Sequence, residues 1–400
     1  MSSDRKVPAK HLYELRDFRY GSGEDRELLA VSVHRGVLPR SEITDKLHRA
    51  DDLADYKRVE PDEIVINRMS AYQGALGIAK QRGIVSPEYL VLRAKKEVEP
   101  RYLSHLFKSS WFVSEMATRV RGIGSLDLGN VRTPRINPED LGRIRVSIPS
   151  LAAQQAIADY LDAETARIDA LIEKKRRLDD LIASRVAALI DTVTNEGKLT
   201  QVRRFISLRT SGPRGWAGRV ESSGTPFIRS ANLQVDSINI KWMGMAFVQE
   251  VESKEAERSR VQVGDVLVGI TGANTGWVGF AEKIHDGAYV SQHVGLLRPR
   301  GVHPKWLAYS VFSPSSREQL LGGQYGGTKQ QLSLDELAEL AIHVPSLERQ
   351  EELVVHLDQQ RAITERLRTK LHCQIELLTE HRQALITAAV TGQLEIPGAA

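Results

Sequence analysis

The stretch Ile148-Pro149-Ser150-Leu151 occurs a second time in the chain, slightly altered, as Val344-Pro345-Ser346-Leu347. The offset between the two prolines is 196 residues, and Leu161 matches Leu357 at the same offset. A fixed offset that holds over about forty residues indicates an internal duplication. The chain is therefore expected to contain two copies of one structural unit.

Each copy of this stretch is expected to begin a long helix. Proline pushes the residue before it toward extended geometry, so Ile148 and Val344 are predicted to end strands. Ser150 and Ser346 are suited to cap the free N–H groups of a first helical turn. The pattern predicts long helical segments over 150–198 and 346–392, with 393–400 as a tail.

Beyond these caps, apolar residues recur every seven positions, a narrow stripe that is typical of a coiled-coil seam. Two such helices in one chain most simply pack on each other. Lys175, Gln360 and Gln374 interrupt the stripe and leave surface for another subunit. The alternative is an ordinary amphipathic helix on a globular core, although forty residues exceed what one core usually covers. The predicted seam residues are Leu161, Ile168, Leu171, Leu178, Ile182, Leu189, Leu353, Leu357, Leu367, Leu371, Leu378 and Leu385.

The composition favours a soluble, cytoplasmic protein of two or three domains. No apolar run approaches the roughly 18 residues that a membrane span needs, and the first residues lack a signal-peptide core. Cys373 is the single cysteine, which excludes disulfides within the chain and disfavours a cysteine-ligated metal. The net charge is +4, with about five excess positive charges in residues 1–149 and about three in 199–345. This distribution is compatible with phosphate contact, and equally with solubility alone.

The segments before the two helices also resemble each other. A turn followed by a buried strand at 59–66 matches another at 261–268, and each strand leads into a polar, glycine-containing loop. A further strand and a short helix that begins with proline, at Pro100 and Pro304, follow in both copies. The sequence therefore predicts an α+β protein with mixed α/β domains over 1–149 and 199–345, each followed by a long helix.

A search for catalytic motifs finds little. An amino-methyltransferase needs an Asn/Asp-Pro-Pro-aromatic loop, and the chain contains no Pro-Pro pair. The glycines at 272–279 have no Lys-Ser/Thr ending, so they do not form a P-loop. The histidines show no pair at ligand spacing, and no nucleophile-base pair is evident. We expect neither a catalytic residue nor a metal or cofactor site in this chain.

The duplicated stretches resemble the specificity subunits of type I restriction-modification systems over essentially the full length. The resemblance is carried by 148–162 (IPSLAAQQAIADYLD), by 345–351 (PSLERQE), by 326–332 (GGTKQQL) and by 385–394 (LITAAVTGQL). The first copy departs from the family at Ala152-Ala153-Gln154, where an acidic residue often precedes the glutamine, and it lacks the Gly-Gly-Thr-Lys-Gln segment. These departures leave the implied architecture intact. They do not allow the role of a residue in one copy to be assigned to the matching residue in the other copy.

The resemblance implies two target-recognition domains separated by an antiparallel coiled coil with pseudo-twofold symmetry. Each domain would read one half of a split double-stranded DNA target through the major groove. Two modification subunits would dock on the helices and methylate adenine N6 with S-adenosylmethionine. With restriction subunits that use ATP and Mg²⁺, the complex would cleave unmodified DNA.

Candidates for DNA contact are side chains with hydrogen-bonding edges on the polar loops. Arginine pairs with guanine, and asparagine or glutamine with adenine. Each candidate has a simpler interpretation, such as phosphate contact without base reading, packing or turn formation. The candidates are Arg68, Tyr72, Gln73, Arg121, Arg132 and Arg135 in the first domain, and Arg229, Asn232, Thr271, Asn274, Thr275, Tyr325, Lys329 and Gln330 in the second.

Two other functions are compatible with the sequence. The chain could be a stand-alone DNA-binding or coiled-coil scaffold protein that recruits something other than a methyltransferase. It could also be an enzyme with an unfamiliar motif, in which case the pure chain would transfer methyl groups by itself. A neighbouring gene with an Asn-Pro-Pro-aromatic loop would favour the specificity subunit.

Overall fold

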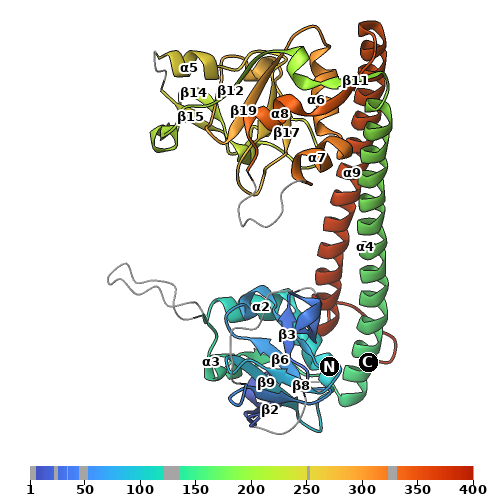
Figure 1. The fold of residues 1–400 in the computed structure, drawn as a ribbon. Helices are drawn as coiled ribbons and strands as arrows, with labels where there is room; N and C mark the ends of the chain where they lie inside the picture. Colours follow the sequence, from blue (N-terminus) through green and yellow to red (C-terminus); the bar gives the residue numbers. More distant parts are fainter. Residues whose placement is uncertain are drawn as a thin grey trace. The chain divides into compact units, whose positions relative to one another are not determined.

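The computed structural model describes residues 6–21, 26–33, 35–44, 53–120, 135–249, 253–322 and 331–399. The chain forms two compact units. The first combines residues 1–175 with 373–400, and the second contains residues 176–372. Each unit contains one mixed domain and a stretch of both long helices (Figure 1).

The central sheet of the first domain has four antiparallel strands in the order β2 (Tyr13–Arg16), β9 (Tyr89–Ala94), β6 (Ile64–Asn67) and β7 (Leu76–Ile78). Smaller sheets pair β1 (Val7–Pro8) with β10 (Arg145–Val146), β3 (Leu29–Ser32) with β4 (Gly36–Pro39), and β5 (Lys57–Val59) with β8 (Gly83–Val85). The helices are α1 (Pro100–Lys108), α2 (Ser110–Ala117) and α3 (Pro138–Gly142).

The second domain repeats this central sheet as β12 (Ile206–Ser211), β19 (Val294–Pro299), β16 (Val266–Gly269) and β17 (Val278–Phe280), again antiparallel and in the same order. A second sheet contains β13 (Val220–Glu221), β15 (Ala246–Val248), β14 (Thr225–Ile228) and β18 (Tyr289–Val290). The domain closes where β11 (Lys198–Gln201) pairs with β20 (Ala341–Val344). Its helices are α5 (Lys254–Ser259), α6 (Pro304–Phe312), α7 (Pro314–Leu321) and α8 (Leu334–Glu339).

A buried carboxylate holds the turn before the central strand of each sheet. Glu63 accepts hydrogen bonds from the Glu60 amide at 2.9 Å and from Arg93 Nε at 3.0 Å. Asp265 does the same with the Gln262 amide at 2.8 Å and Arg298 Nε at 2.9 Å. Because a buried carboxylate needs a charged partner, this matched arrangement extends the duplication from the strands to their supporting ion pairs.

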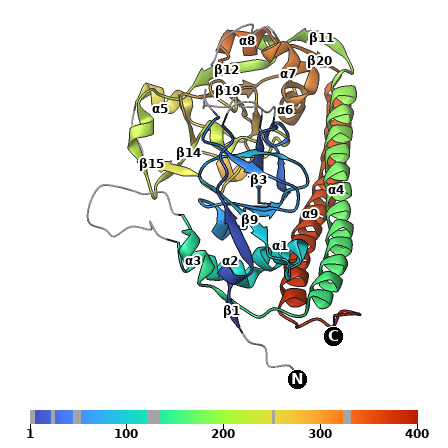
Figure 2. The same ribbon diagram turned by 90° about the horizontal axis from the view of Figure 1, so that it is seen from below.

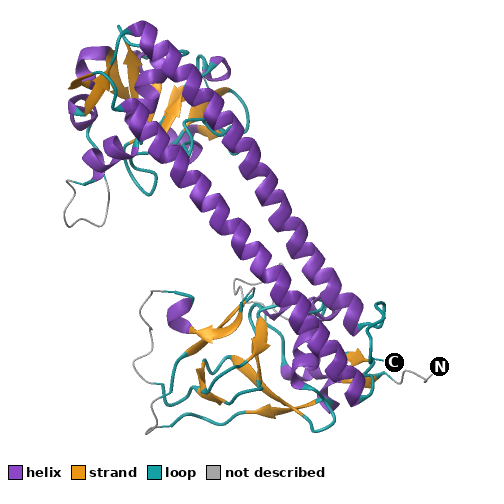
Figure 3. Cartoon of the chain, turned by 90° about the vertical axis from the view of Figure 1, so that its right-hand side faces the viewer, coloured by secondary structure: helices purple, strands orange, loops and turns teal. Residues whose placement is uncertain are grey.

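The long helices are α4 (Leu151–Thr194) and α9 (Leu347–Val390), and each is continuous (Figure 3). Both serine caps are confirmed, since the hydroxyl of Ser150 accepts from the Ala153 amide and that of Ser346 from the Arg349 amide. None of the described helices is long and apolar enough to cross a membrane.

The helices pack together in antiparallel fashion, as predicted, and ion pairs in each unit give the direction. In the first unit Asp169 accepts from Arg382 at 2.9 Å, and Lys175 donates to Gln374 at 2.7 Å, so two of the polar interruptions pair with each other. In the second unit, Asp179 accepts from Arg368 at 2.8 Å and Glu196 from Arg349 at 2.7 Å.

The predicted seam residues fall into three groups. Leu161, Ile168, Leu353, Leu357 and Leu371 are buried. Ile182, Leu189, Leu378 and Leu385 are half-buried. The structure places Leu171, Leu178 and Leu367 on the outer surface, with exposed fractions of 41%, 44% and 44%.

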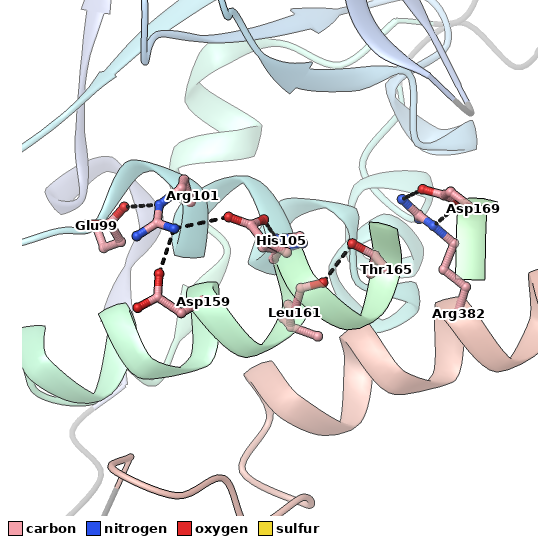
Figure 4. Close-up of polar contacts among 9 residues, drawn as sticks. Glu99, Arg101, His105, Asp159, Leu161, Thr165, Asp169 and Arg382 are labelled. Carbon is pink, nitrogen blue, oxygen red and sulfur yellow. Dashed lines mark hydrogen bonds and ion pairs between the residues drawn. The ribbon is translucent and has the colours of Figure 1, made fainter. Parts of the chain in front are cut away.

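Each domain is held by the long helix that follows it in the chain, through side chains at equivalent positions. In the first unit, α1 lies beside the long helices (Figure 2). Arg101 of α1 donates to Asp159 at 2.7 Å and to Asp162 at 3.1 Å, and Asp162 also contacts His105 (Figure 4). In the second unit Asp358, 196 residues after Asp162, accepts from Lys305 at 2.7 Å and from Tyr309. Thus α4 holds the first domain as α9 holds the second.

The opposite helix supplies a second, shorter contact to each domain. The Ser110 amide at the start of α2 donates to the Thr387 hydroxyl of α9 at 3.0 Å. The Ser315 amide near the start of α7 donates to Asp191 of α4 at 2.9 Å. Thr387 and Asp191 are again 196 residues apart, so the duplication extends to single hydrogen bonds.

The pair Asp179–Arg368 makes stability depend on pH in a defined direction. The hydrogen bond from Arg368 holds the pKa of Asp179 below its usual value of 3.8. The stabilisation is therefore complete above the unfolded-state pKa and is lost as pH falls through the lower folded-state pKa. We expect Asp179→Asn to lower the free energy of unfolding by about 1–3 kcal/mol at pH 7.

Urea unfolding of the two proteins between pH 7 and pH 3.5 checks this prediction. The difference between wild type and Asp179→Asn should shrink toward the acid end. Asp180→Asn is the matched control, because Asp180 is the exposed neighbour of Asp179 on α4. A constant difference across the pH range, or an equal loss in the control, would contradict the assignment.

Candidate nucleic-acid interface

In the first domain the polar loop after β6 is joined to the segment before α3. Arg68 Nε donates to the carbonyl of Ile136 at 3.0 Å, and its Nη2 donates to the Asn137 side chain at 3.0 Å. The Ile136 amide returns a hydrogen bond to the carbonyl of Arg68 at 3.1 Å. Through these contacts Arg68 holds two loops together.

Arg135 lies beside this junction and is more accessible. Its side chain is 52% exposed, and its guanidinium lies 3.6 Å from Glu88, which is also 3.8 Å from Arg68. Tyr72 is half-buried and accepts a long contact from Gln73, which is exposed. The ion pair between Arg135 and Glu88 is exposed and therefore weak, so Arg135 can exchange Glu88 for a phosphate or a base edge.

In the second domain, the equivalent loop after β16 meets two other loops. Asn274 donates to the carbonyl of Ser230 at 2.7 Å, and Arg229 donates to the carbonyl of Gly244 at 3.0 Å. Thr271 contacts His293 Nδ1 at 2.5 Å. The amide of Leu332 donates to the carbonyl of Ile270, which repeats the contact between Ile136 and Arg68 in the first domain.

Two of the predicted DNA-contact residues are buried. Asn232 is 1% exposed, accepts from the Arg229 amide and donates to the carbonyl of Lys241, both at 3.0 Å. Thr275 is also 1% exposed and donates to the carbonyl of Gly272 at 2.7 Å. In this conformation both side chains hold their own loops. Arg229, Thr271 and Asn274 are half-buried, and Asn274 contacts Ser230, the chain neighbour of Arg229.

Five predicted contact residues lie outside the described residues: Arg121, Arg132, Tyr325, Lys329 and Gln330. Their chain neighbours nevertheless belong to the same loop clusters. Arg135 and Ile136 follow the first segment, and Gln331, which pairs with Thr271, follows the second.

Sequence reasoning missed the side chains that fix the domains to the helices. Gln154 and Gln350 are both 1% exposed, and each accepts from a backbone amide of its domain, Glu99 at 2.9 Å and His303 at 2.8 Å. The signal was present, because the two glutamines occupy equivalent positions in the duplicated stretch. An exposed apolar pair, Trp242 and Met243, also lies on the second-domain loop and was not singled out.

No group of three or more potential metal ligands occurs among the described residues. The loops described above present arginine, amide and hydroxyl groups, which neighbouring backbone groups hold in place. Such groups suit recognition of phosphates and base edges.

Comparison with known proteins supplies the context of these loops. The model of the family described as type I restriction modification DNA specificity domain matches residues 52–178 and 220–377. The chain is 22% identical over 376 residues to the type I restriction enzyme EcoKI specificity subunit of Escherichia coli K12, covering 84% of this chain and 76% of that protein. It is 21% identical to the StySPI specificity subunit of Salmonella potsdam, with the same coverage.

A solved structure has the same fold. A chain from a structural study of complex assembly and conformational transition of the type I R-M system superposes with a TM-score of 0.72 at 16% identity, and covers 98% of both chains. The duplicated sheets and the paired long helices are thus features that this chain shares with a known structure.

Proposed function

Since the chain belongs to the family of type I restriction modification DNA specificity domains, we propose that each of its domains reads one half of a split DNA target. The chain is the specificity subunit of a type I restriction-modification system. Such subunits recognise DNA and are not themselves catalytic, which confirms the expectation that this chain is not the enzyme of its complex.

One contrast supports the proposal that each domain reads its own half of the target. The two domains share the same framework of sheet and helix contacts, but their polar loops differ. The central sheets share strand order and buried ion pairs, and the contacts of Gln154 and Asp162 with the first domain match those of Gln350 and Asp358 with the second. The loops that these frames present differ in chemistry: Arg68 and Arg135 in one domain, and Arg229, Thr271 and Asn274 in the other. Different donors and acceptors at equivalent places would select different bases.

The helices supply the docking surface in this proposal. Leu171 and Leu181 on α4 are exposed, and so are Leu367 and Leu377 at the equivalent positions of α9. In this proposal a docked subunit buries these exposed leucines, which lie at equivalent positions on the two helices. Two equivalent apolar positions fit two modification subunits, which would bring S-adenosylmethionine and methylate adenine N6. Restriction subunits with ATP and Mg²⁺ would add cleavage in the cytoplasm.

Single-molecule sequencing of methylated adenines tests the proposal. DNA from cells with the gene should carry methylation at one motif with two defined halves and a fixed gap, and DNA from cells without it should not. The complex reconstituted from this chain and the modification subunit should methylate the same motif in vitro. Methylation of an undivided motif would contradict the two-reader proposal. No methylation from the reconstituted complex would favour a stand-alone DNA-binding or scaffold protein.

A further inference from the structure

We propose that Arg368 and Arg361 of α9 are positioning residues for target reading by the second domain. They act through residues 234–237, which connect the helix to the loop that carries Arg229 and Asn232. The inference rests on the proposed function, because it assigns these residues to the reading of one half of the split target.

The contact between helix and loop is made by two short hydrogen bonds. Arg368 Nη1 donates to Asp236 at 2.7 Å, and Arg361 Nη2 donates to the hydroxyl of Ser237, also at 2.7 Å. The first of these is a charge-assisted bond, which is about twice as strong as a neutral one. Both arginines lie on α9, seven residues apart, and therefore point to the same side of the helix.

Both guanidinium groups are themselves held in place. Arg368 also makes a two-pronged contact with Asp179 of α4, at 2.8 Å from Nε and 3.2 Å from Nη2. Arg361 lies over the Tyr309 ring at 5.6 Å and donates to its hydroxyl, which in turn contacts Asp358. The arginines are thus fixed parts of the helix pair, because contacts other than those to the loop already restrict their rotamers.

The loop transmits its position from Asp236 to the candidate reading residues. Ile238 is buried, and its carbonyl accepts from the Phe280 amide of β17 at 2.7 Å. The loop closes at Asn232 and Lys241, where the Asn232 side chain donates to the Lys241 carbonyl and the Lys241 amide donates to the Asn232 carbonyl. Any shift at 236–237 would therefore move this closed loop, whose Asn232 side chain accepts a hydrogen bond from the Arg229 amide.

Packing alone does not hold residues 234–237 on the helices. They line a cavity of about 640 Å³ together with Val186 and Ile190 of α4, with Phe312 and Pro314, and with α9. Where a cavity separates two surfaces, dispersion contacts between them are lost. The hydrogen bonds of Arg368 and Arg361 therefore join Asp236 and Ser237 to α9 across this cavity.

The first domain cannot have the same connection. The positions of α4 that correspond to Arg361 and Arg368, 196 residues earlier, carry Thr165 and Ile172. Both are buried, and Thr165 donates to the carbonyl of Leu161 in its own helix. A change at Asp236 should consequently affect reading of one half of the target only.

Asp236→Ala tests the inference, since Asp236 lies on the surface and the change leaves Arg368 paired with Asp179. The reconstituted complex is assayed for binding to the methylated motif found above and to single base changes in each half. We expect discrimination in the second-domain half to fall by about 5–10-fold, which is the lower part of the range of a mismatch penalty. Discrimination in the other half should not change.

Three further variants separate positioning from general stability. Asp236→Glu, which keeps the carboxylate, should restore much of the lost discrimination. Ser237→Ala, which removes the contact of Arg361, should reduce discrimination in the same half. Glu196→Ala is the matched control, because it breaks an exposed pair with Arg349 in the same unit that does not touch the loop.

The outcomes are distinct. Unchanged discrimination by Asp236→Ala overturns the inference and leaves the proposed function intact. Equal losses in both halves, or a loss that merely follows a lower melting temperature, also overturn it. If the wild-type complex recognises no split motif, the proposed function itself fails.

Discussion

Leu161→Ala is expected to lower the free energy of unfolding by about 2–5 kcal/mol, the range for truncating a fully buried leucine. Leu161 has no exposed surface and belongs to a core that includes Tyr102 and Leu106 of α1 and Ile386 of α9. Its removal leaves a cavity where the first domain and both helices of that unit meet. Urea unfolding monitored by circular dichroism measures the loss.

Leu171→Ala is the matched control for this prediction. Leu171 lies ten residues further along the same helix but is 41% exposed. The same change in chain chemistry and helix propensity should therefore cost no more than about 0.5 kcal/mol in the isolated chain. Equal losses for Leu161 and Leu171 would mean that both face the seam.

The sequence predicted the paired helices, because duplicated leucines at a seven-residue spacing leave little alternative. At the first predicted seam position, Ile182, Leu189, Leu378 and Leu385 are half-buried. Leu161, Ile168, Leu357 and Leu371 are buried. The second seam position is different. In α4 this position is occupied by Thr165, Ile172 and Asp179. Because two of these residues are polar, the position is not recognisable as apolar in the sequence, and the prediction chose Leu171 and Leu178, which lie one residue away. One residue turns a side chain by about 100° around a helix, from the seam to the outer surface.

The polar loops that carry the candidate residues could be located from the sequence, but the sequence did not show which of their side chains are accessible. A buried strand that ends in a polar, glycine-containing segment places a loop at the sheet edge, and the structure has both loops there. Whether an amide faces inward depends on contacts between distant loops. Asn232 is buried because Lys241 closes its loop, whereas Asn274 is half-buried and bridges to Ser230. No local pattern separates these two asparagines.

The seven-residue repeat likewise does not predict the contact of Arg368 with Asp236. Arginine at a seam position looks like a defect in an apolar stripe. The structure shows that it has charged partners on both α4 and the second domain. Positions where a repeat carries unequal residues, such as Ile172 and Arg368, are therefore the places to look for functions that differ between the copies.

Exchange of residues 199–345 for the corresponding domain of another family member is expected to change one half of the recognised motif and leave the other half and the gap unaltered. The chain ends of this domain meet in one short ladder, in which Lys198 pairs with Val344 and Gln201 with Ala341. A graft cut at this ladder replaces a closed unit. Methylated-adenine sequencing reads both halves in one experiment.

The graft must keep the contacts that orient the domain on the helices. Asp358 needs the partners that Lys305 and Tyr309 provide, and Asp191 needs a free amide at the start of α7. With these kept, affinity for the original second half should fall by at least about 100-fold, since mismatches of about 1–3 kcal/mol each add up over several base pairs. Exchange of residues 1–149 should produce the reciprocal change. If either exchange altered both halves, the two domains would not read independently, and the equivalence of their frames would not extend to function.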